Sequence, residues 1–420
     1  MPKLNKINYA ATAIATAGEA ISANDAVYVA SAGTADTAAA AYKADADIVT
    51  KSTEVSIIGF ATAAAASGTP VAIQFAGILG GFSGLTAGRT YYLSSTAGAI
   101  TADATSQQSV GVAVSAAKLL ILAPTPSRFG IGRGIHAGGW ISAASNVIDY
   151  ITIATKGNAT DFGDLSVARR IEEGGLASSS RGIFGGGTTG SYVNTIDYIT
   201  IATTGNAEDF GDLFVTRGYS GGLSSATRGL FGGGYDGSIL NTIDYVTIAT
   251  LGNAADFGDL FSTRYAPCAC SSPTRGLFSG GYDGARSNVI DYVTIATLGN
   301  AADFGDLTVA RSTLGGCSSA TRGIFAGGVD ASGYANEIDY VTIASAGNAI
   351  DFGDLTAARQ SPNGCSSLIR GLFGGGWDDS SSNIIEQVTI ATLGNATDFG
   401  DLTVARYGTA PCSDVHGGLG

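Results

Sequence analysis

Apolar and polar residues alternate in short runs along this chain, and Gly, Asn, Asp and Ser separate the runs. The run NTIDYVTIAT at 241–250 begins in this way, with Ile243 and Tyr245 on either side of Asp244. An alternation of period two predicts a half-buried strand. The next residues, LGNA at 251–254, include Gly and Asn, which tolerate positive φ and predict a turn. The pattern therefore predicts an all-β protein of short strands and tight turns.

This pattern repeats six times in the later part of the chain, with a period of 47 or 48 residues. In the third copy we expect four strands, near 228–232, 241–250, 256–263 and 264–270. A repeat of about 40–50 residues with four strands is typical of a β-propeller blade. The copies start at Arg133, Arg181, Arg228, Arg275, Arg322 and Arg370. The first Asp of the phrase DFGDL keeps the same step, at Asp161, Asp209, Asp256, Asp303, Asp351 and Asp398.

The repeat resembles the Kelch family. The residues that carry the resemblance are the glycine doublet followed by Tyr-Asp-Gly at 233–237 and 280–284, the strand NTIDY, and the ending Ala310-Arg311. The resemblance implies a six-bladed propeller over residues 128–420. The family's Trp after the third strand is replaced by Phe, which we expect to fill the same gap between blades. These residues are Phe162, Phe210, Phe257, Phe304, Phe352 and Phe399.

The Kelch strand order also predicts how the ring closes. In that order the run 264–270 becomes the innermost strand of the following blade, and the first blade lacks such a strand. The C-terminal run 406–412 is left over, so we expect it to complete the first blade. Pairing these two segments would hide two sheet edges that would otherwise stay exposed.

Residues 1–122 lack the repeat and show short alternating runs, such as AVYV at 26–29 and VAIQF at 71–75. They predict a small β barrel or sandwich. The segments GFSGLTAGRTYYLSSTAGAIT (81–101) and SVGVAVSAAKLLIL (109–122) resemble a module of bacteriophage tail-fibre and capsid-decoration proteins. The resemblance implies a component of the virion surface whose N-terminal domain docks onto other virion proteins. The two prolines of residues 123–127 predict a short, stiff linker between the domains.

The charge balance excludes one class of partner. The chain has 22 Lys and Arg against 35 Asp and Glu, a net charge of −13, and no basic run. A phosphate backbone would be repelled, so we expect no nucleic-acid binding. The N-terminus MPKLNKINYA lacks the apolar core of a signal peptide, and no apolar run approaches the ~18 residues of a membrane span. We therefore expect no secretion signal and no membrane insertion.

Cys and His residues do not form a recognisable catalytic or metal-binding pattern. Cys270, Cys317, Cys365 and Cys412 take equivalent positions, which Leu176 and Leu223 occupy in the other copies, and Cys268 completes the set. A position that accepts Cys or Leu indicates a buried apolar site. His136 stands where the second copy has Phe184, which predicts packing. We expect no enzyme activity, no cofactor and no metal.

Each copy also repeats an Asp and an Arg. We expect ion pairs and hydrogen bonds that tie turns and adjacent blades. An anion channel lined by the arginines is the alternative. The aspartates precede a Leu, at Asp164, Asp212, Asp259, Asp306, Asp354 and Asp401. The arginines are Arg169, Arg217, Arg264, Arg311, Arg359 and Arg406.

Two segments of the repeat vary between copies, namely the turn after the glycines and the start of the inner strand. Alternate turns of an antiparallel blade lie at opposite ends, so both variable segments should share one face. Aromatic rings beside carboxylates suit a sugar or a protein epitope, whereas unselected loop variation is the alternative. The candidate ligand-binding residues are Trp140, Tyr192, Tyr235, Asp236, Tyr282, Asp283, Arg286, Tyr334, Trp377 and Asp378.

These observations predict a bacteriophage structural protein, either a tail fibre or a capsid decoration, which forms a homo-oligomer. Its propeller would bind a host-surface glycan or receptor. Three alternatives stay open: a passive capsid-stabilising protein, a propeller enzyme of the galactose-oxidase or glycosidase type, and a cytoplasmic Kelch adaptor. The enzyme would need clustered ligands or catalytic groups at unequal positions, and the adaptor would need a partner domain.

Overall fold

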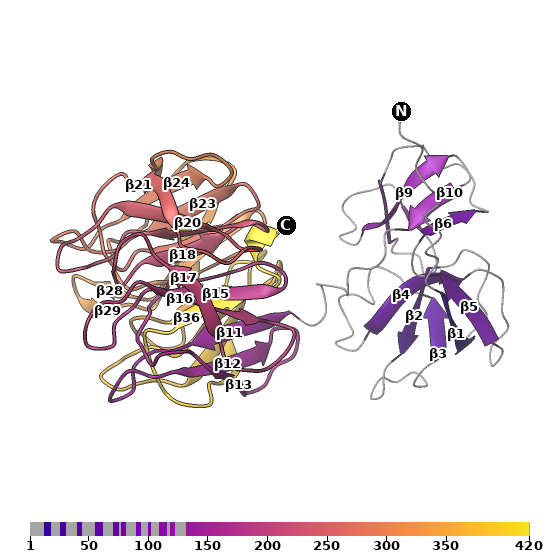
Figure 1. Cartoon of the computed structure of the whole chain (residues 1–420), viewed down its shortest axis with the longest axis horizontal. Coiled ribbons are helices and arrows are strands. Elements are labelled where there is room, and N and C mark those ends of the chain that lie inside the picture. The colour runs from indigo at the N-terminus through magenta and orange to yellow at the C-terminus, as the bar shows by residue number, and fades with distance from the viewer. Residues whose placement is uncertain are drawn as a thin grey trace. The chain divides into compact units, whose positions relative to one another are not determined.

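The computed structural model describes residues 132–419 and, before them, ten strands (Figure 1). Clustering of contacts divides the chain into two compact units, Met1–Ile131 and Gly132–Gly420. The predicted linker at 123–127 lies outside the described residues.

In the first unit the strands pair in two groups, in the orders β1-β3-β2-β4-β5 and β6-β10-β9-β7-β8. The expectation of a barrel or a sandwich stays a prediction. The strands are β1 (Thr12–Ala17), β2 (Ala26–Ala30), β3 (Ala40–Lys43), β4 (Val55–Ala61), β5 (Pro70–Gln74), β6 (Gly77–Gly80), β7 (Thr90–Leu93), β8 (Ile100–Thr101), β9 (Ser109–Ser115) and β10 (Lys118–Ile121).

The second unit is a ring of six antiparallel four-stranded sheets, which confirms the predicted propeller. From the innermost strand outwards, blade 1 is β36 (Ala410–Ser413), β11 (Arg133–Ala137), β12 (Val147–Thr152) and β13 (Thr160–Asp164), and blade 2 is β14 (Gly175–Ala177), β15 (Arg181–Gly185), β16 (Thr195–Thr200) and β17 (Glu208–Asp212). Blade 3 is β18 (Gly221–Ser224), β19 (Arg228–Gly232), β20 (Thr242–Thr247) and β21 (Ala255–Asp259), and blade 4 is β22 (Cys268–Ser271), β23 (Arg275–Ser279), β24 (Val289–Thr294) and β25 (Ala302–Asp306). Blade 5 is β26 (Gly315–Ser318), β27 (Arg322–Ala326), β30 (Glu337–Thr342) and β31 (Ile350–Asp354), and blade 6 is β32 (Asn363–Ser366), β33 (Arg370–Gly374), β34 (Ile384–Thr389) and β35 (Thr397–Asp401). A short hairpin, β28 (Val329–Asp330) with β29 (Gly333–Tyr334), projects from blade 5, and η1 (Gly417–Leu419) ends the chain.

The predicted closure is confirmed. β36 pairs antiparallel with β11, with Ala137 opposite Ala410 and Gly134 opposite Ser413. Each inner strand therefore comes from the segment that follows the previous blade, and the last segment of the chain completes the first blade.

The predicted strands exist, but several of their boundaries are corrected. The strand expected at 241–250 is β20, which ends at Thr247. The strand expected at 256–263 is β21, which ends at Asp259, and the inner strand expected from Arg264 begins only at Cys268. The residues between them leave strand conformation because Arg264 is buried in an ion pair and Ala266 has a φ of 51°. The chain uses this irregular segment to cross from the outside of one blade to the inside of the next.

The Phe of DFGDL fills the gap between blades, as expected. Phe210 of blade 2 is buried in one cluster with Phe231 and Val246 of blade 3. An arginine reinforces the same boundary, because Arg181 stacks over Tyr198 at 4.5 Å and donates to the carbonyl of Ile248 in the next blade at 2.7 Å. Burial of the ring and this hydrogen bond hold neighbouring blades together.

The six arginines that recur at the same position of each repeat are buried, and each forms an ion pair with a carboxylate of the next blade. Arg217, for example, contacts Asp244 at 2.9 Å. The expectation that these arginines tie adjacent blades is confirmed, but the carboxylates that precede Leu are not their partners. The arginines do not line the central cavity, so the alternative of an anion channel is wrong. The pairs are Arg169–Asp197, Arg217–Asp244, Arg264–Asp291, Arg311–Asp339, Arg359–Glu386 and Arg406–Asp149.

Candidate functional site

The two variable segments of each repeat meet on one face of the propeller, which we call the variable face. The first residue after the glycines bridges to the segment that leads into the inner strand of the same blade. The bridged pairs are Trp140 with Tyr407, Thr188 with Arg170, Tyr235 with Gly218, Tyr282 with Tyr265, Val329 with Ser312, and Trp377 with Gln360. The loops are therefore held in place by backbone pairing.

Five tyrosines form a continuous cluster on blades 2 to 4. The rings of Tyr192 and Tyr235 lie edge to face at 5.6 Å, and Tyr235 contacts Tyr265 at 5.8 Å. Tyr265 continues to Tyr282 at 5.4 Å, and Tyr219 contacts both Tyr192 and Tyr265. The rings are half-buried rather than fully exposed, because they pack on one another.

An arginine extends this cluster toward blade 1. The guanidinium of Arg170 lies over the rings of Tyr219 at 4.7 Å and Tyr407 at 5.3 Å, and it pairs with Glu172 at 3.1 Å. Tyr407 in turn contacts Trp377 at 5.2 Å. Burial raises the pKa of Tyr219 to about 12, so its hydroxyl stays protonated at physiological pH.

Several residues of this network were not among the predicted site residues. Arg170, Tyr219, Tyr265 and Tyr407 all lie in the segment that leads into an inner strand, which varies between copies. That variation was the signal that could have found them. The sequence pattern places both segments on one face, but it does not show which rings touch.

The other predicted residues also lie in the loops that follow the glycines. Tyr334 donates to Asp379 of the neighbouring loop at 3.2 Å. Asp236 and Asp283 are exposed, and each accepts a backbone N–H of its own loop, from Ser238 at 2.8 Å and Ala285 at 3.2 Å. The remaining residues of the predicted set, Arg286 and Asp378, are also exposed.

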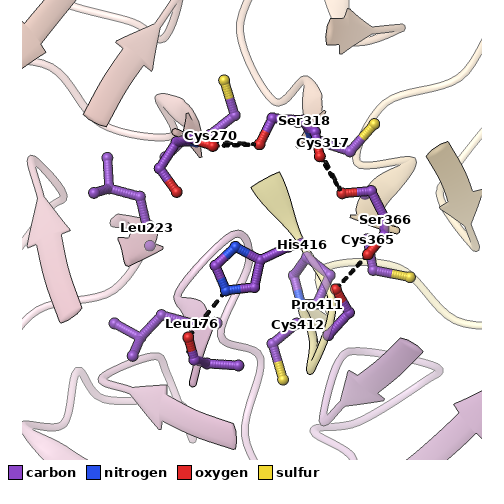
Figure 2. Close-up of a pocket in the computed structure, with 18 of the residues that line it drawn as sticks. Leu176, Leu223, Cys270, Cys317, Ser318, Cys365, Ser366, Pro411, Cys412 and His416 are labelled. Carbon is purple, nitrogen blue, oxygen red and sulfur yellow. Dashed lines mark hydrogen bonds between the residues drawn. The ribbon is translucent and has the colours of Figure 1, made fainter. Parts of the chain in front are cut away.

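The inner strands enclose a narrow central cavity of about 50 Å³ (Figure 2). A ladder of serines lines it, in which Ser271 donates to the carbonyl of Ser224 at 2.7 Å and Ser318 donates to that of Ser271 at 2.7 Å. Ser224 donates to the carbonyl of Ala177 at 2.7 Å, and His416 Nε2 lies 2.9 Å from the same carbonyl. Figure 2 shows the imidazole lying across the cavity, so the C-terminal residues obstruct this end.

Glu173 crosses the same channel near the variable face. It belongs to blade 2, and its buried carboxylate accepts the N–H of Gly316 in blade 5, on the opposite side of the ring. Burial raises its pKa well above the ordinary value, and the nearby Glu172 raises it further. Side chains thus obstruct the channel near both ends, and the cavity has room for about one or two water molecules.

The thiols pack against the neighbouring blade and do not face the cavity. Figure 2 shows the sulfurs of Cys270, Cys317, Cys365 and Cys412 pointing away from its centre. All five Cys are buried and free. Cys365 lies 3.9 Å from His136 Nε2, but burial raises the pKa of the thiol to about 12 and lowers the pKa of the imidazole to about 3. Both groups are therefore neutral, and no thiolate forms at physiological pH.

Within residues 132–419 no group of three or more His, Cys, Asp or Glu is placed to hold a metal ion. The described part of the chain also has no helix that could cross a bilayer. A scan against models of known protein families and a search of curated proteins found no match to this chain. The assignment of a six-bladed fold therefore rests on the strand pairing in the structure and not on similarity to a known protein.

Proposed function

We propose that this chain is a non-enzymatic recognition protein of a bacteriophage particle, whose propeller binds a host-surface glycan or protein through the variable face. One observation supports the recognition role above all. The six blades are nearly identical except on that face, and there the aromatic side chains gather in contact with one another. Tyr and Trp offer large, ordered contact surfaces with a polar edge.

The place on the virion rests on the resemblance of residues 81–122 to tail-fibre and decoration modules. In this proposal the first 122 residues attach to other virion proteins, and several copies assemble into a homo-oligomer. A non-enzymatic role agrees with the neutral, buried state of the Cys365 and His136 pair, since neither group is positioned to meet a substrate.

The test is binding of the labelled full chain to a panel of bacterial cells. A variant with Trp140, Tyr235, Tyr282 and Trp377 replaced by Ala should bind at least about tenfold more weakly, because it loses the rings of the variable face. The matched control replaces Leu251, Leu298 and Leu393, which are exposed in the uniform turns at the opposite ends of the blades, by Ala.

The control should bind like the wild type, and thermal melting should show that both variants are folded. If the wild type binds no cells, or the aromatic variant binds as well as the control, the recognition role is refuted and a passive role on the particle surface is favoured.

A further inference from the structure

Phe214 and Phe261 are the most exposed large hydrophobic side chains of the described residues, at 65% and 68%. They occupy the same place in successive blades, two residues after the outermost strand. In the other four copies this place holds a hydroxyl residue, at Ser166, Thr308, Thr356 and Thr403. Blades 2 and 3 therefore depart from the repeat by exposing a ring.

At three of these four positions the hydroxyl donates a hydrogen bond to a buried carboxylate. Ser166 donates to Asp197 at 2.6 Å, and Thr403 donates to Asp149 at 2.6 Å, while the same carboxylates pair with the buried arginines. Thr308 makes the equivalent bond to Asp339.

Phe cannot make this bond. The Oδ1 atoms of Asp244 and Asp291, which face Phe214 and Phe261, are buried without a hydrogen-bond partner among the described residues. Burial raises the pKa of both carboxyl groups. A buried oxygen without a partner destabilises the fold, so stability alone would favour Ser or Thr here. Residues that weaken the fold without a compensating contact are expected at functional positions.

The backbone segments that carry the two phenylalanines run beside the loops that carry the tyrosines. Leu260 N–H bonds to the carbonyl of Asn241, and Arg264 N–H bonds to that of Leu240, so the segment of Phe261 runs beside the loop of Tyr235. The N–H of Phe261 also bonds to Asp291 of blade 4, at 3.1 Å. Phe261 is therefore placed at the boundary between blades 3 and 4, beside the loop of Tyr235.

The corresponding bonds place Phe214 at the preceding boundary of the ring, between blades 2 and 3. Leu213 and Arg217 donate to the carbonyls of Asn194 and Val193, in the loop that carries Tyr192, and Phe214 N–H bonds to Asp244 of blade 3. Around the ring the order is thus Tyr192, Phe214, Tyr235, Phe261 and Tyr282.

The boundary between blades 2 and 3 and the boundary between blades 3 and 4 consequently carry the same set of side chains. The first set is Phe214, Tyr235 and Asp236, and the second is Phe261, Tyr282 and Asp283. No other boundary between blades combines the exposed Phe with Gly-Gly-Tyr-Asp-Gly. Two like sets, one blade step apart, suit a ligand that itself consists of like units, which describes a polysaccharide better than a folded protein.

The chemistry of each set favours a neutral sugar. The exposed Phe offers a ring face to the apolar face of a pyranose, and the exposed carboxylate can accept hydrogen bonds from hydroxyl groups. The net charge of −13 opposes an anionic chain. We propose that the boundary between blades 2 and 3 and the boundary between blades 3 and 4 form two successive subsites for a neutral, repeating polysaccharide, in which Phe214 and Phe261 are stacking platforms. This proposal rests on the proposed recognition function.

The experiment uses the full chain and cells that bind it. Surface material from these cells is separated into a neutral polysaccharide fraction, an acidic polysaccharide fraction and a protein fraction, and each is used as the probe. The wild type should bind the neutral fraction. The variant Phe214→Thr/Phe261→Thr should bind it at least about tenfold more weakly, because both platforms are lost.

The same variant should melt at a higher temperature, by about 2–4 °C per site, because Thr restores the missing hydrogen bond to Asp244 and Asp291. Loss of binding in a stabilised protein cannot be attributed to unfolding. The control is Thr403→Phe, which places an exposed ring between blades 6 and 1 and removes a bond to Asp149. It should melt at a lower temperature and bind the neutral fraction like the wild type.

The outcomes separate the two proposals. A wild type that binds no cells refutes the recognition function itself. A wild type that binds cells through the acidic or the protein fraction refutes only the assignment to a neutral polysaccharide. A double Thr variant that binds the neutral fraction as tightly as the wild type refutes the role of the two phenylalanines.

Discussion

His136 occupies the place that Phe fills in the other five blades, and it is fully buried there. It packs against Gly374 of blade 6, just as Phe231 packs against Gly185 of blade 2. Burial, together with the smaller effect of the charge of Arg406, lowers the pKa of the imidazole to about 3. The side chain is thus neutral in the folded state over the whole physiological range, although its ordinary pKa is 6.5.

This difference predicts a pH-dependent stability. The unfolded chain takes up a proton below pH 6.5 and the folded chain only near pH 3, so the free energy of unfolding should fall as the pH drops through this window. The variant His136→Phe should lose this dependence. The free energy of unfolding of the variant, measured with urea, should exceed that of the wild type by a margin that grows by roughly 1 kcal/mol for each pH unit between about pH 6 and pH 4. Parallel pH profiles of the two proteins would contradict the prediction.

The sequence predicted the packing of His136, because the repeat supplied Phe184 as its equivalent. It did not predict the roles of Glu172 and Glu173. These residues follow the one inserted position of the first copy, and no other copy has a carboxylate that could be compared with them. The reach of Glu173 across the ring depends on the distance between opposite blades, which a one-dimensional pattern does not contain.

At the scale of the element, the inner strands explain why one position of the repeat holds either Cys or Leu. A Cβ added to Gly323 of blade 5 would lie 2.7 Å from the sulfur of Cys270, and one added to Gly229 of blade 3 would lie 2.5 Å from Leu176. Each inner strand thus inserts one apolar side chain into the space left by a Gly of the next blade. The sequence indicated an apolar site at these positions, but it did not identify the Gly partner.

We expect replacement of all five Cys by Ala to leave binding intact. Each replacement should lower the free energy of unfolding by about 1 kcal/mol, because only a small buried side chain is removed. The measurements are urea unfolding and the binding of cells. Gly323→Ala is the informative comparison, since the added methyl group would overlap Cys270 and should destabilise the fold more than the loss of one thiol. Loss of binding in a folded Cys-free protein would assign the thiols a function.

The ends of the elements were predicted less well than their existence. The run 264–270 looks continuous in sequence, yet Arg264 turns inward to its carboxylate and the strand begins only at Cys268. The role of the exposed Phe rings was likewise not predicted from the sequence. The change from LS or LT to LF at Phe214 and Phe261 is visible in the repeat, but its meaning depends on the buried aspartates of the next blade, which the structure identifies.

At the scale of the molecule, the same contacts recur between every pair of neighbouring blades, and those between blades 6 and 1 join distant parts of the chain. Arg370 donates to the carbonyl of Ile153, and Asp401 N–H donates to Asn158, across more than 200 residues in each case. The repeat number and the closing strand were predictable, because both follow from the phase of the copies. The position of His416 in the central cavity was not, because residues 414–420 have no equivalent in the repeat.

The closing strand gives the last prediction. Deletion of residues 404–420 should unfold or aggregate the propeller, because blade 1 loses β36, the ion pair of Arg406 with Asp149 is broken, and the edge of β11 is exposed. Deletion of residues 417–420 alone is the control, since it removes η1 and keeps β36. Circular dichroism melting and size-exclusion chromatography distinguish the two outcomes. The control should stay folded with a cooperative transition. A long deletion that melts at the wild-type temperature would show that the ring does not need this strand, and the closing contacts would then have no part in stability.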